Sequence, residues 1–326
     1  MKTLCTRDVW QAAALLRAGA LVAFPTETVY GLGADATSAE AVMAIFAAKG
    51  RPADNPLIVH VAEPAALGAV AEVNPLAAGL VARFWPGPLT VVLPARPLVA
   101  PAARAGLPTV GVRCPDHALA RELLRACGRP LAAPSANRSG RPSPTSAEAV
   151  MEELDGRIAA VLDGGPCRLG VESTVVDCTG AAARILRLGA LPAEVLGLRP
   201  CSDPAATARS PGTRHRHYAP AVPLHLVADL AASLRRWPAA AVLCRQEEAA
   251  WLGLVPGEAA ALWPETAEGR AAVLFSTLRR LEKSGRPAIV VTSLPDTGLD
   301  AATMDRLRRA AAAGQEESPA PGGSLA

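Results

Sequence analysis

Short apolar runs with strand-like alternation recur through residues 5–200, and alanine-rich stretches with helical period separate them. The pattern predicts strands near residues 20–24, 57–62, 89–93, 109–113, 158–162, 173–177 and 184–188. No internal repeat is evident in the chain. Because strands and helices alternate, we expect this segment to fold as one α/β domain around a mixed, twisted sheet.

Residues 201–220 break that pattern. They are rich in Pro, Ser, Thr and Arg and lack an apolar period, so they are typical of a linker. After them, PLHLV, AAAVLC and AIVVTS alternate with helical patterns over residues 273–281 and 304–312. This alternation predicts a small Rossmann-like α/β domain over residues 221–313. Residues 314–326 have the composition of a disordered tail.

A helix with cations at its end is predicted over residues 38–48. Thr37 and Glu40 have capping-box spacing, and apolar residues at positions 42, 45 and 46 share one helical face. Gly50 ends the helix, and Lys49 and Arg51 flank that glycine. The lysine stands out because the chain has only three lysines against 30 arginines. The two cations can bind phosphates or simply stabilise a helix C-terminus, and the sequence leaves both interpretations open.

Three further segments place polar side chains where a ligand can meet them. His60 lies on the opposite face of its strand from the alternating apolar positions 57, 59 and 61, either as a ligand contact or as a core histidine. Thr109 and Arg113 share one strand face, which fits a binding edge or a solvated polar face. Ser135 and Asn137 belong to a turn that either binds an anion or only stabilises its loop.

Composition narrows the possibilities. A length of 326 residues with 50% hydrophobic content allows two ordinary cores, and a net charge of +3 means that any anion site must come from local clustering. The seven cysteines show no CxxC spacing, which argues against a zinc site or disulfide framework and favours a cytoplasmic location. No segment has the ~20 apolar residues that span a bilayer. His215 and His217 have metal-pair spacing, but they lack a third ligand nearby, which favours a solvated basic linker.

Several segments together resemble one known family. FPTETVYGLG at 24–33 and KGRPADNPLIVH at 49–60 are similar to the signature of the YrdC-type threonylcarbamoyl-AMP synthases. The remaining family segments follow in the family's order: PGPLTVVL at 86–93, TVGVRCPDH at 109–117, APSANRSGRPSPT at 133–145, ESTVVD at 172–177 and ILRLGA at 185–190. SPGTRHRHYAP at 210–220 resembles the linker of the family's longer, two-domain form. The resemblance therefore covers nearly all of residues 5–200 and continues into the linker.

The resemblance implies an enzyme, a nucleotidyltransferase that makes L-threonylcarbamoyladenylate from L-threonine, bicarbonate and ATP and releases pyrophosphate. This product is the first intermediate of a tRNA adenosine modification. The implied catalytic cations are Lys49 and Arg51, acting with Mg²⁺ carried on the phosphates. The implied threonine contacts are Thr28, His60, Arg113, Ser135 and Ser173. The implied nucleotide contacts are Arg51, Asn55, Thr109, Asn137, Thr145, Arg187 and Tyr218.

Residues 201–220 contain SPGTRHRHYAP, whose charged residues lie between prolines, and we expect this stiff segment to close over the active site as a lid; a flexible tether is the alternative. The resemblance implies a downstream transferase complex as partner, with weak or transient tRNA binding. No protein ligand for a metal ion is expected. Two other functions stay open: an RNA-binding module, disfavoured by an aromatic content of 3%, and a hydrogenase-maturation carbamoyltransferase, disfavoured by the lack of zinc-finger cysteine pairs.

Overall fold

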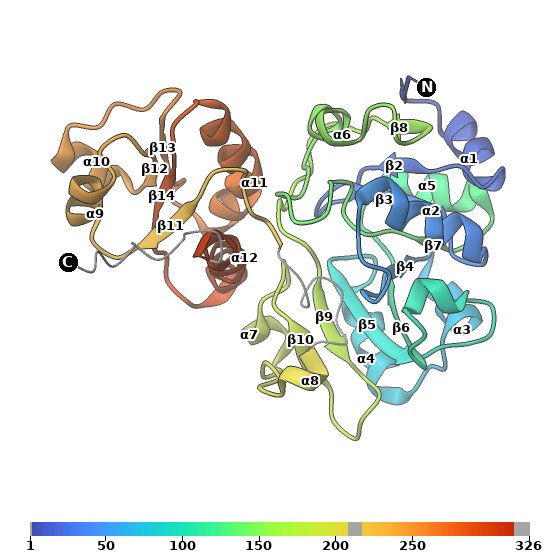
Figure 1. Ribbon diagram of the computed structural model, residues 1–326. Helices are drawn as coiled ribbons and strands as arrows, with labels where there is room; N and C mark the ends of the chain where they lie inside the picture. Colours follow the sequence, from blue (N-terminus) through green and yellow to red (C-terminus); the bar gives the residue numbers. More distant parts are fainter. Residues whose placement is uncertain (1, 208–216, 316–326) are drawn as a thin grey trace, which may run out of the picture.

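Two sheets divide the molecule into a larger and a smaller domain (Figure 1). The computed structural model describes residues 2–207 and 217–315. The larger sheet has ten strands in the order β1-β8-β2-β3-β7-β4-β6-β5-β9-β10, and it mixes parallel with antiparallel pairs. Its strands are β1 (Leu4–Thr6), β2 (Val22–Phe24), β3 (Gly31–Asp35), β4 (Ile58–His60), β5 (Leu89–Pro94), β6 (Thr109–Arg113), β7 (Leu131–Ala132), β8 (Ala160–Leu162), β9 (Thr174–Asp177) and β10 (Arg184–Arg187). The predicted α/β domain with a mixed sheet is confirmed.

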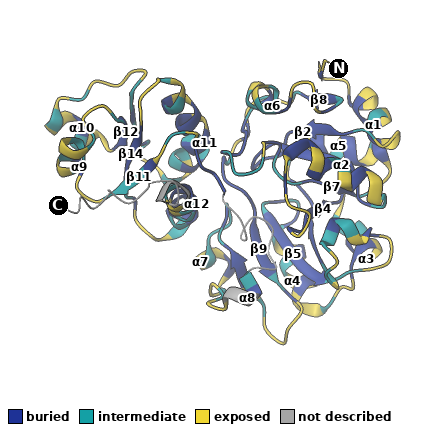
Figure 2. Ribbon diagram, in the orientation of Figure 1, coloured by how far each residue is buried: buried dark blue, intermediate teal, exposed yellow. Residues whose placement is uncertain are grey.

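Alternating residues of the sheet strands enter two separate cores. Ala23 and Val59 pack in a large cluster with α2, while Val22 and Phe24 pack on the other face with α1 and α5. Figure 2 shows these strands buried and the outer sides of the helices exposed. The helices of this domain are α1 (Val9–Arg17), α2 (Ala39–Lys49), α3 (Leu67–Val70), α4 (Pro75–Phe84), α5 (Ala118–Cys127), α6 (Ala147–Leu154) and α7 (Ala193–Leu196), with short 3₁₀ turns over Pro64–Ala66 and Pro101–Arg104. The period-2 pattern of the strands thus builds a sheet covered on both faces.

The helix over 39–49 forms as predicted, but its N-terminal cap is different. Ser38, not Thr37, is the N-cap residue, and its side chain accepts a hydrogen bond from the backbone N–H of Ala41. Thr37 instead donates its hydroxyl to Asp35 Oδ1 at 2.7 Å, so the predicted capping box is wrong. Gly50 does end the helix, in the left-handed conformation with φ of 61°. This places the two cations of the motif around a sharp turn.

The smaller domain has a parallel four-stranded sheet in the order β11-β14-β12-β13. Its strands are β11 (Leu224–Val227), β12 (Ala241–Cys244), β13 (Ala260–Leu262) and β14 (Ile289–Thr292), and its helices are α9 (Leu230–Arg236), α10 (Gln246–Leu252), α11 (Ala267–Lys283) and α12 (Gly298–Gln315). In Figure 1, α9 and α10 lie on the outer side of this sheet, and α11 and α12 lie on the side that faces the larger domain.

The two domains contact each other through α11 and α12. Arg279 on α11 pairs with Glu153 at 2.9 Å and donates to the carbonyl oxygen of Pro142. Gly170 of the larger domain has φ of 74°, and a Cβ atom there would lie 2.3 Å from the carbonyl oxygen of Ala271 on α11. Backbone approaches backbone at this point, which only glycine permits.

Some sequence expectations need correction. The pattern missed four short strands, β1, β3, β7 and β13. The predicted linker over 201–220 contains a helical turn, α8 (Pro204–Thr207), and residues 208–216 lie outside the described residues. The predicted tail begins too early, because α12 continues to Gln315; residues 316–326, on which the rest of that prediction falls, are likewise outside the described part. Within the described residues no helix has the length and apolarity to cross a membrane.

Candidate active site

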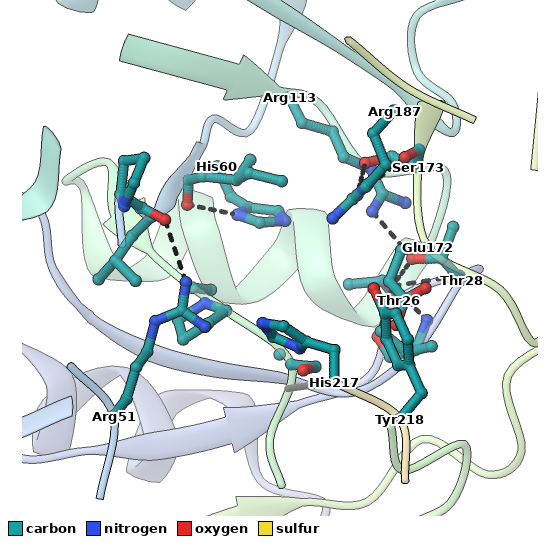
Figure 3. A pocket seen from close by; sticks show the side chains of 18 residues that line it. Thr26, Thr28, Arg51, His60, Arg113, Glu172, Ser173, Arg187, His217 and Tyr218 are labelled. Atoms are coloured by element: carbon teal, nitrogen blue, oxygen red, sulfur yellow. Dashed lines mark hydrogen bonds between the residues drawn. The ribbon is translucent and has the colours of Figure 1, made fainter. Parts of the chain in front are cut away.

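A cavity lies where the last residues of β4, β6 and β10 meet the 26–31 loop, the turn after β7 and residues 217–218 (Figure 3). The last residues of two parallel strands, His60 and Arg113, are register partners and so point to the same face. The polar residues that line the cavity are Thr26, Thr28, Arg51, His60, Arg113, Ser135, Glu172, Ser173, Arg187, His217 and Tyr218. Loops and strand ends from the whole length of the larger domain therefore contribute to one site.

A chain of hydroxyl groups orders the part of the cavity next to Arg113. Arg113 Nη1 donates to Thr28 Oγ1 at 2.8 Å, and Thr28 Oγ1 lies 2.8 Å from Thr26 Oγ1. Because the Thr26 hydroxyl donates its own proton to Val29, Thr28 is the donor of that second bond. Thr26 in turn donates to the carbonyl oxygen of Val29 at 2.7 Å and accepts from two backbone N–H groups of the same turn. All three side chains are buried. This direction of donation leaves little freedom for Thr28, so its position is fixed before a ligand arrives.

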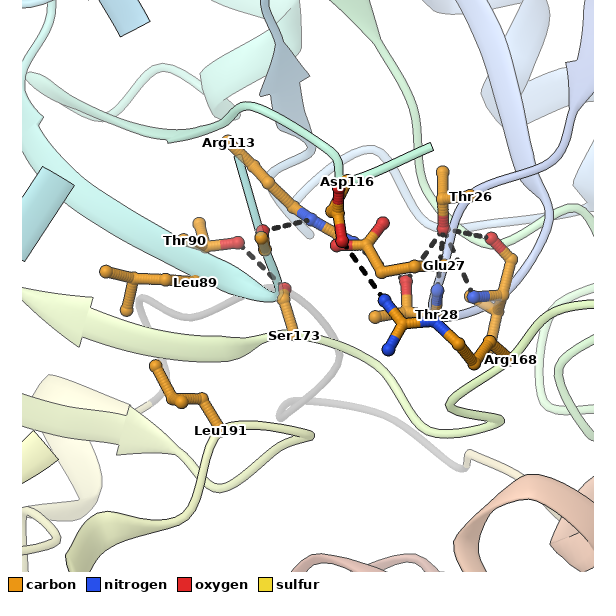
Figure 4. Close-up of polar contacts among 12 residues, drawn as sticks. Thr26, Glu27, Thr28, Leu89, Thr90, Arg113, Asp116, Arg168, Ser173 and Leu191 are labelled. Carbon is orange, nitrogen blue, oxygen red and sulfur yellow. Dashed lines mark hydrogen bonds and ion pairs between the residues drawn. The ribbon is translucent and has the colours of Figure 1, made fainter. Parts of the chain in front are cut away.

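Arg113 is held by a buried carboxylate that the sequence did not reveal. Glu27 is only 1% exposed, and its Oε1 lies 2.6 Å from Arg113 Nη2 (Figure 4). Arg113 Nε also donates to the carbonyl oxygen of Gly87 at 3.3 Å. Because a guanidinium has five N–H groups, each terminal nitrogen retains one for a substrate carboxylate. The ion pair therefore orients the Arg113 guanidinium and still leaves it N–H groups that can bind a substrate carboxylate.

His60 is kept neutral. Its Nδ1 donates to the carbonyl oxygen of Ile58 at 3.2 Å, and its ring packs edge-on against Phe24 with centroids 5.9 Å apart. Burial, and then the nearby charge of Arg113, lowers the pKa of His60 to about 3. The imidazole thus has an unprotonated Nε2 at neutral pH, which is an acceptor for a substrate N–H or O–H.

Two further buried guanidinium groups, those of Arg51 and Arg187, add positive charge to the cavity. Arg51 Nη2 makes only long hydrogen bonds, 3.4 Å to the carbonyl oxygen of Asn55 and 3.3 Å to that of Pro56. Burial lowers the pKa of Arg51 to about 10, so the group stays protonated at neutral pH. Arg187 Nη2 donates to the carbonyl oxygen of Ser173 at 2.8 Å, and burial also lowers the pKa of Arg187. Desolvated cations in one cavity favour a polyanionic ligand.

Lys49 is buried but does not line the cavity. Its Nζ donates to the carbonyl oxygens of Ser135 and Asn137, and the side chain is 3% exposed. Ser135 Oγ donates to Asn137 Oδ1 at 2.6 Å, which closes the same turn. Burial, followed by the charge of Arg51, lowers the pKa of Lys49 well below its usual value. In this arrangement the ammonium fastens the Ser135–Asn137 turn and does not line the cavity.

The site residues predicted from the sequence divide into two groups. Thr28, Arg51, His60, Arg113, Ser135, Ser173, Arg187 and Tyr218 line the cavity, whereas Lys49, Asn55, Thr109, Asn137 and Thr145 do not. Thr109 begins β6, at the opposite end of the strand from Arg113. Asn55, Asn137 and Thr145 are buried close behind the lining residues, and Asn137 Nδ2 donates to two carbonyl oxygens of its own loop. Sequence reasoning missed Thr26, Glu27, Glu172 and His217, although the motifs that it singled out contain all four.

Comparisons with known proteins show which family the chain belongs to. The Sua5_yciO_yrdC family model, described as "Telomere recombination", matches residues 14–189, and the model described as "Threonylcarbamoyl-AMP synthase, C-terminal domain" matches residues 183–312. A threonylcarbamoyl-AMP synthase of Bacillus subtilis is 44% identical over 94% of both chains. One from Pyrococcus abyssi is 43% identical over 92% of both chains. The chain belongs to the threonylcarbamoyl-AMP synthase family.

Similarity at this level extends to the arrangement of both domains. The crystal structure of P. abyssi Sua5 complexed with L-threonine superposes with a TM-score of 0.84 at 40% identity, covering 95% of this chain and 97% of that one. The resemblance drawn from the motifs is thereby confirmed, as are the two-domain form and an enzyme of this kind.

The lining residues also limit how a metal ion can be held. Among residues 2–207 and 217–315, no three His, Cys, Asp or Glu side chains are grouped as metal ligands. The one carboxylate among the lining residues belongs to Glu172, whose oxygens already accept from Ser143 Oγ at 2.6 Å and Arg306 Nε at 2.9 Å. These residues fit an ion held by substrate phosphates better than an ion held by the protein.

Proposed function

We propose that this chain joins L-threonine, bicarbonate and ATP into L-threonylcarbamoyladenylate and releases pyrophosphate. The observation that carries the proposal is that one cavity brings together two chemically different sets of groups. The hydroxyl of Thr28, the neutral imidazole of His60 and the guanidinium of Arg113 suit an amino acid, and the buried guanidinium groups of Arg51 and Arg187 suit phosphates. Family membership over both domains favours this reaction over an RNA-binding module or a hydrogenase carbamoyltransferase.

Arg113 would hold the threonine carboxylate with its remaining N–H groups, and Thr28, Ser135 and Ser173 would contact the rest of the molecule. His60 Nε2 would accept a hydrogen bond from the amino acid. Since threonine is the molecule in the P. abyssi complex, this half of the proposal has support from a relative. Pocket shape would then set the preference for threonine over serine at roughly 10–200-fold, because one methyl group carries about 1–3 kcal/mol.

Arg51 and Arg187 would neutralise the triphosphate, with Tyr218 beside the nucleotide. We keep Lys49 as a predicted catalytic cation and Asn55, Thr109, Asn137 and Thr145 as predicted nucleotide contacts. Lys49 and Asn137 also hydrogen-bond carbonyl oxygens of the 135–141 loop.

Bicarbonate would lose water to give CO₂, taking up one proton, and the neutral amine of threonine would add to that CO₂ and release one proton, which leaves a carbamate. A carbamate oxygen would then attack the α-phosphorus, and the bond between that phosphorus and the bridging oxygen of pyrophosphate would break. The described lining residues include no proton-transferring dyad, so positioning and charge stabilisation would supply the catalysis.

Mg²⁺ would accompany ATP, held on its phosphates, and would supply further neutralisation of charge there. The product would pass to a transferase complex that modifies tRNA, with transient tRNA contact in that assembly. We place the reaction in the cytoplasm, where ATP and tRNA are found; the free thiols of all seven cysteines agree with a reducing compartment.

The test is an assay of pyrophosphate release from ATP with threonine and bicarbonate omitted in turn. We expect release only when both are present, together with a new adenylate in the products. Release that is independent of threonine would overturn the proposal, and salt-dependent RNA binding without ATP turnover would favour the RNA-binding alternative.

A further inference from the structure

Arg306 belongs to α12 of the smaller domain, yet its guanidinium reaches the wall of the cavity. The side chain is completely buried. Its Nε donates to Glu172 Oε2 at 2.9 Å, and its Nη1 donates to the carbonyl oxygen of Leu188 at 2.7 Å and to Asp305 Oδ2 at 2.8 Å. Glu172 lines the cavity, so a cation from the second domain neutralises a carboxylate of the active site.

The same helices support Tyr218, which also lines the cavity. Tyr218 has φ of 66°, in the left-handed region that non-glycine residues seldom occupy. Its ring stacks on Phe275 of α11, with centroids 5.5 Å apart and 26° between the planes. The guanidinium of Arg306 lies 5.4 Å from the centre of the same ring. The second domain therefore holds an unfavourable backbone conformation in place from two helices.

We propose that Arg306 is a positioning residue, through which the second domain completes the nucleotide side of the active site. It acts through two groups, Glu172 and Tyr218, and has no contact of its own with the reacting atoms. This inference rests on the proposed function, because it assigns ATP to the cavity. None of the described lining residues belongs to α11 or α12, so the second domain would act on the site indirectly, through Arg306.

The physical reason is electrostatic. Burial raises the pKa of Glu172, but the charges of Arg306 and Arg187 outweigh burial and leave that pKa below its usual value. The carboxylate is therefore ionised beside a site that must accept a triphosphate. Without Arg306, Arg187 alone would offset the negative charge of Glu172, so the remaining charge would oppose ATP, and Tyr218 would lose part of its support.

The experiment compares full-length Arg306→Met, the double variant Glu172→Gln with Arg306→Met, and Phe275→Leu. Arg308→Met is the matched control, because Arg308 lies on the same helix, is half exposed and pairs only with Asp296 in the described structure. ATP affinity is measured by calorimetry, and KM for ATP and for threonine by pyrophosphate release. All assays are run well below the melting midpoint of each variant.

We expect Arg306→Met to weaken ATP binding by about tenfold or more, while KM for threonine changes by less than about threefold. The double variant should recover most of the ATP affinity, because the unpaired carboxylate is gone. Phe275→Leu should weaken ATP binding in the same direction, and Arg308→Met should match the unsubstituted chain.

Unchanged ATP affinity in a folded Arg306→Met variant would overturn the inference, and so would a double variant no better than the single one. If Arg306→Met does not fold, the ATP affinities of Phe275→Leu and of the double variant are compared with that of the unsubstituted chain instead. Unchanged affinity in a folded Phe275→Leu variant would then overturn the inference. Failure of the inference is distinct from failure of the proposed function. An unsubstituted chain that binds ATP but makes no adenylate would refute the function, and ATP binding by the variants would still test the positioning role.

Discussion

Lys49 and Arg51 are two residues apart in one motif, but the structure gives them different tasks. Lys49 donates to two buried carbonyl oxygens and does not line the cavity, whereas Arg51 lines the cavity and makes two long hydrogen bonds to backbone. Replacing each cation by methionine should therefore separate a structural contact from a ligand contact.

For Lys49→Met, the carbonyl oxygens of Ser135 and Asn137 lose their donor while they remain buried. Each orphaned acceptor costs about 1–3 kcal/mol, and relief of the buried ammonium offsets part of this, so we expect a net loss of roughly 2–4 kcal/mol in unfolding free energy. At about 2–4 °C per kcal/mol, the melting midpoint of the first domain should fall by roughly 4–16 °C. Catalysis should fall as well, because the turn that presents Ser135 loosens.

For Arg51→Met, the two hydrogen bonds that are lost are long, so the melting midpoint should move by about 2 °C or less. A charge-assisted phosphate contact contributes roughly 1.5–3 kcal/mol, which corresponds to an increase of about 10–150-fold in KM for ATP. Scanning calorimetry and pyrophosphate release, measured on the same preparations, give both quantities.

The reasoning fails if the two patterns are exchanged. A Lys49→Met variant of unchanged stability that loses only ATP affinity would make the ammonium a phosphate ligand, as the resemblance implied. An Arg51→Met variant that melts early but binds ATP normally would make Arg51 the structural cation. Arg104→Met, on a 3₁₀ turn away from the cavity, is the control for removal of a positive charge.

Three further predictions follow from other buried groups. Arg113→Ala should lower the free energy of unfolding by about 3–5 kcal/mol in urea titrations, because it leaves Glu27 charged and unpaired. The double variant with Glu27→Gln should recover most of that loss, and a double variant with no recovery would refute the ion-pair argument. The free energy of unfolding should decrease as pH falls below about 6.5. The folded pKa values of His60 and His217, about 3 and about 2, lie below the unfolded value, so the unfolded chain binds more protons in this range. Each histidine contributes up to about 1.4 kcal/mol per pH unit, and a His60→Gln variant whose stability has the same pH slope would contradict this. Gly170→Ala should separate the domains locally and lower the melting midpoint, and a variant with unchanged protection of α11 in hydrogen exchange would show that the contact is dispensable.

Local pattern predicted most elements of the fold. The helix over 39–49 and its end at Gly50 follow from side-chain period and a left-handed glycine, both of which depend on neighbours within one or two turns. Strands β4, β5 and β6 were predicted within one or two residues, because alternation over five or six positions is a strong signal. The missed strands are two to five residues long or rich in small residues; β3, with the sequence GLGAD, lacks any such alternation.

The site was only partly accessible from sequence. Motif resemblance selected eight lining residues, but it did not distinguish Arg51, which faces the cavity, from Lys49, which faces carbonyl groups behind it. Glu27 carried no periodic or spacing signal, and its partner Arg113 lies in another motif. The guanidinium of Arg113 also contacts Thr28, which is 85 residues away in the sequence.

Long-range pairing accounts for the rest. Glu172 and Arg306 are 134 residues apart and lie in different domains, so nothing in either local sequence indicates that one neutralises the other. Periodicity and capping depend on backbone geometry over a few residues, so the sequence alone predicts them. Which buried charges meet depends on how the two sheets and their helices pack, because the favourable contact exists only once both domains have excluded water from it.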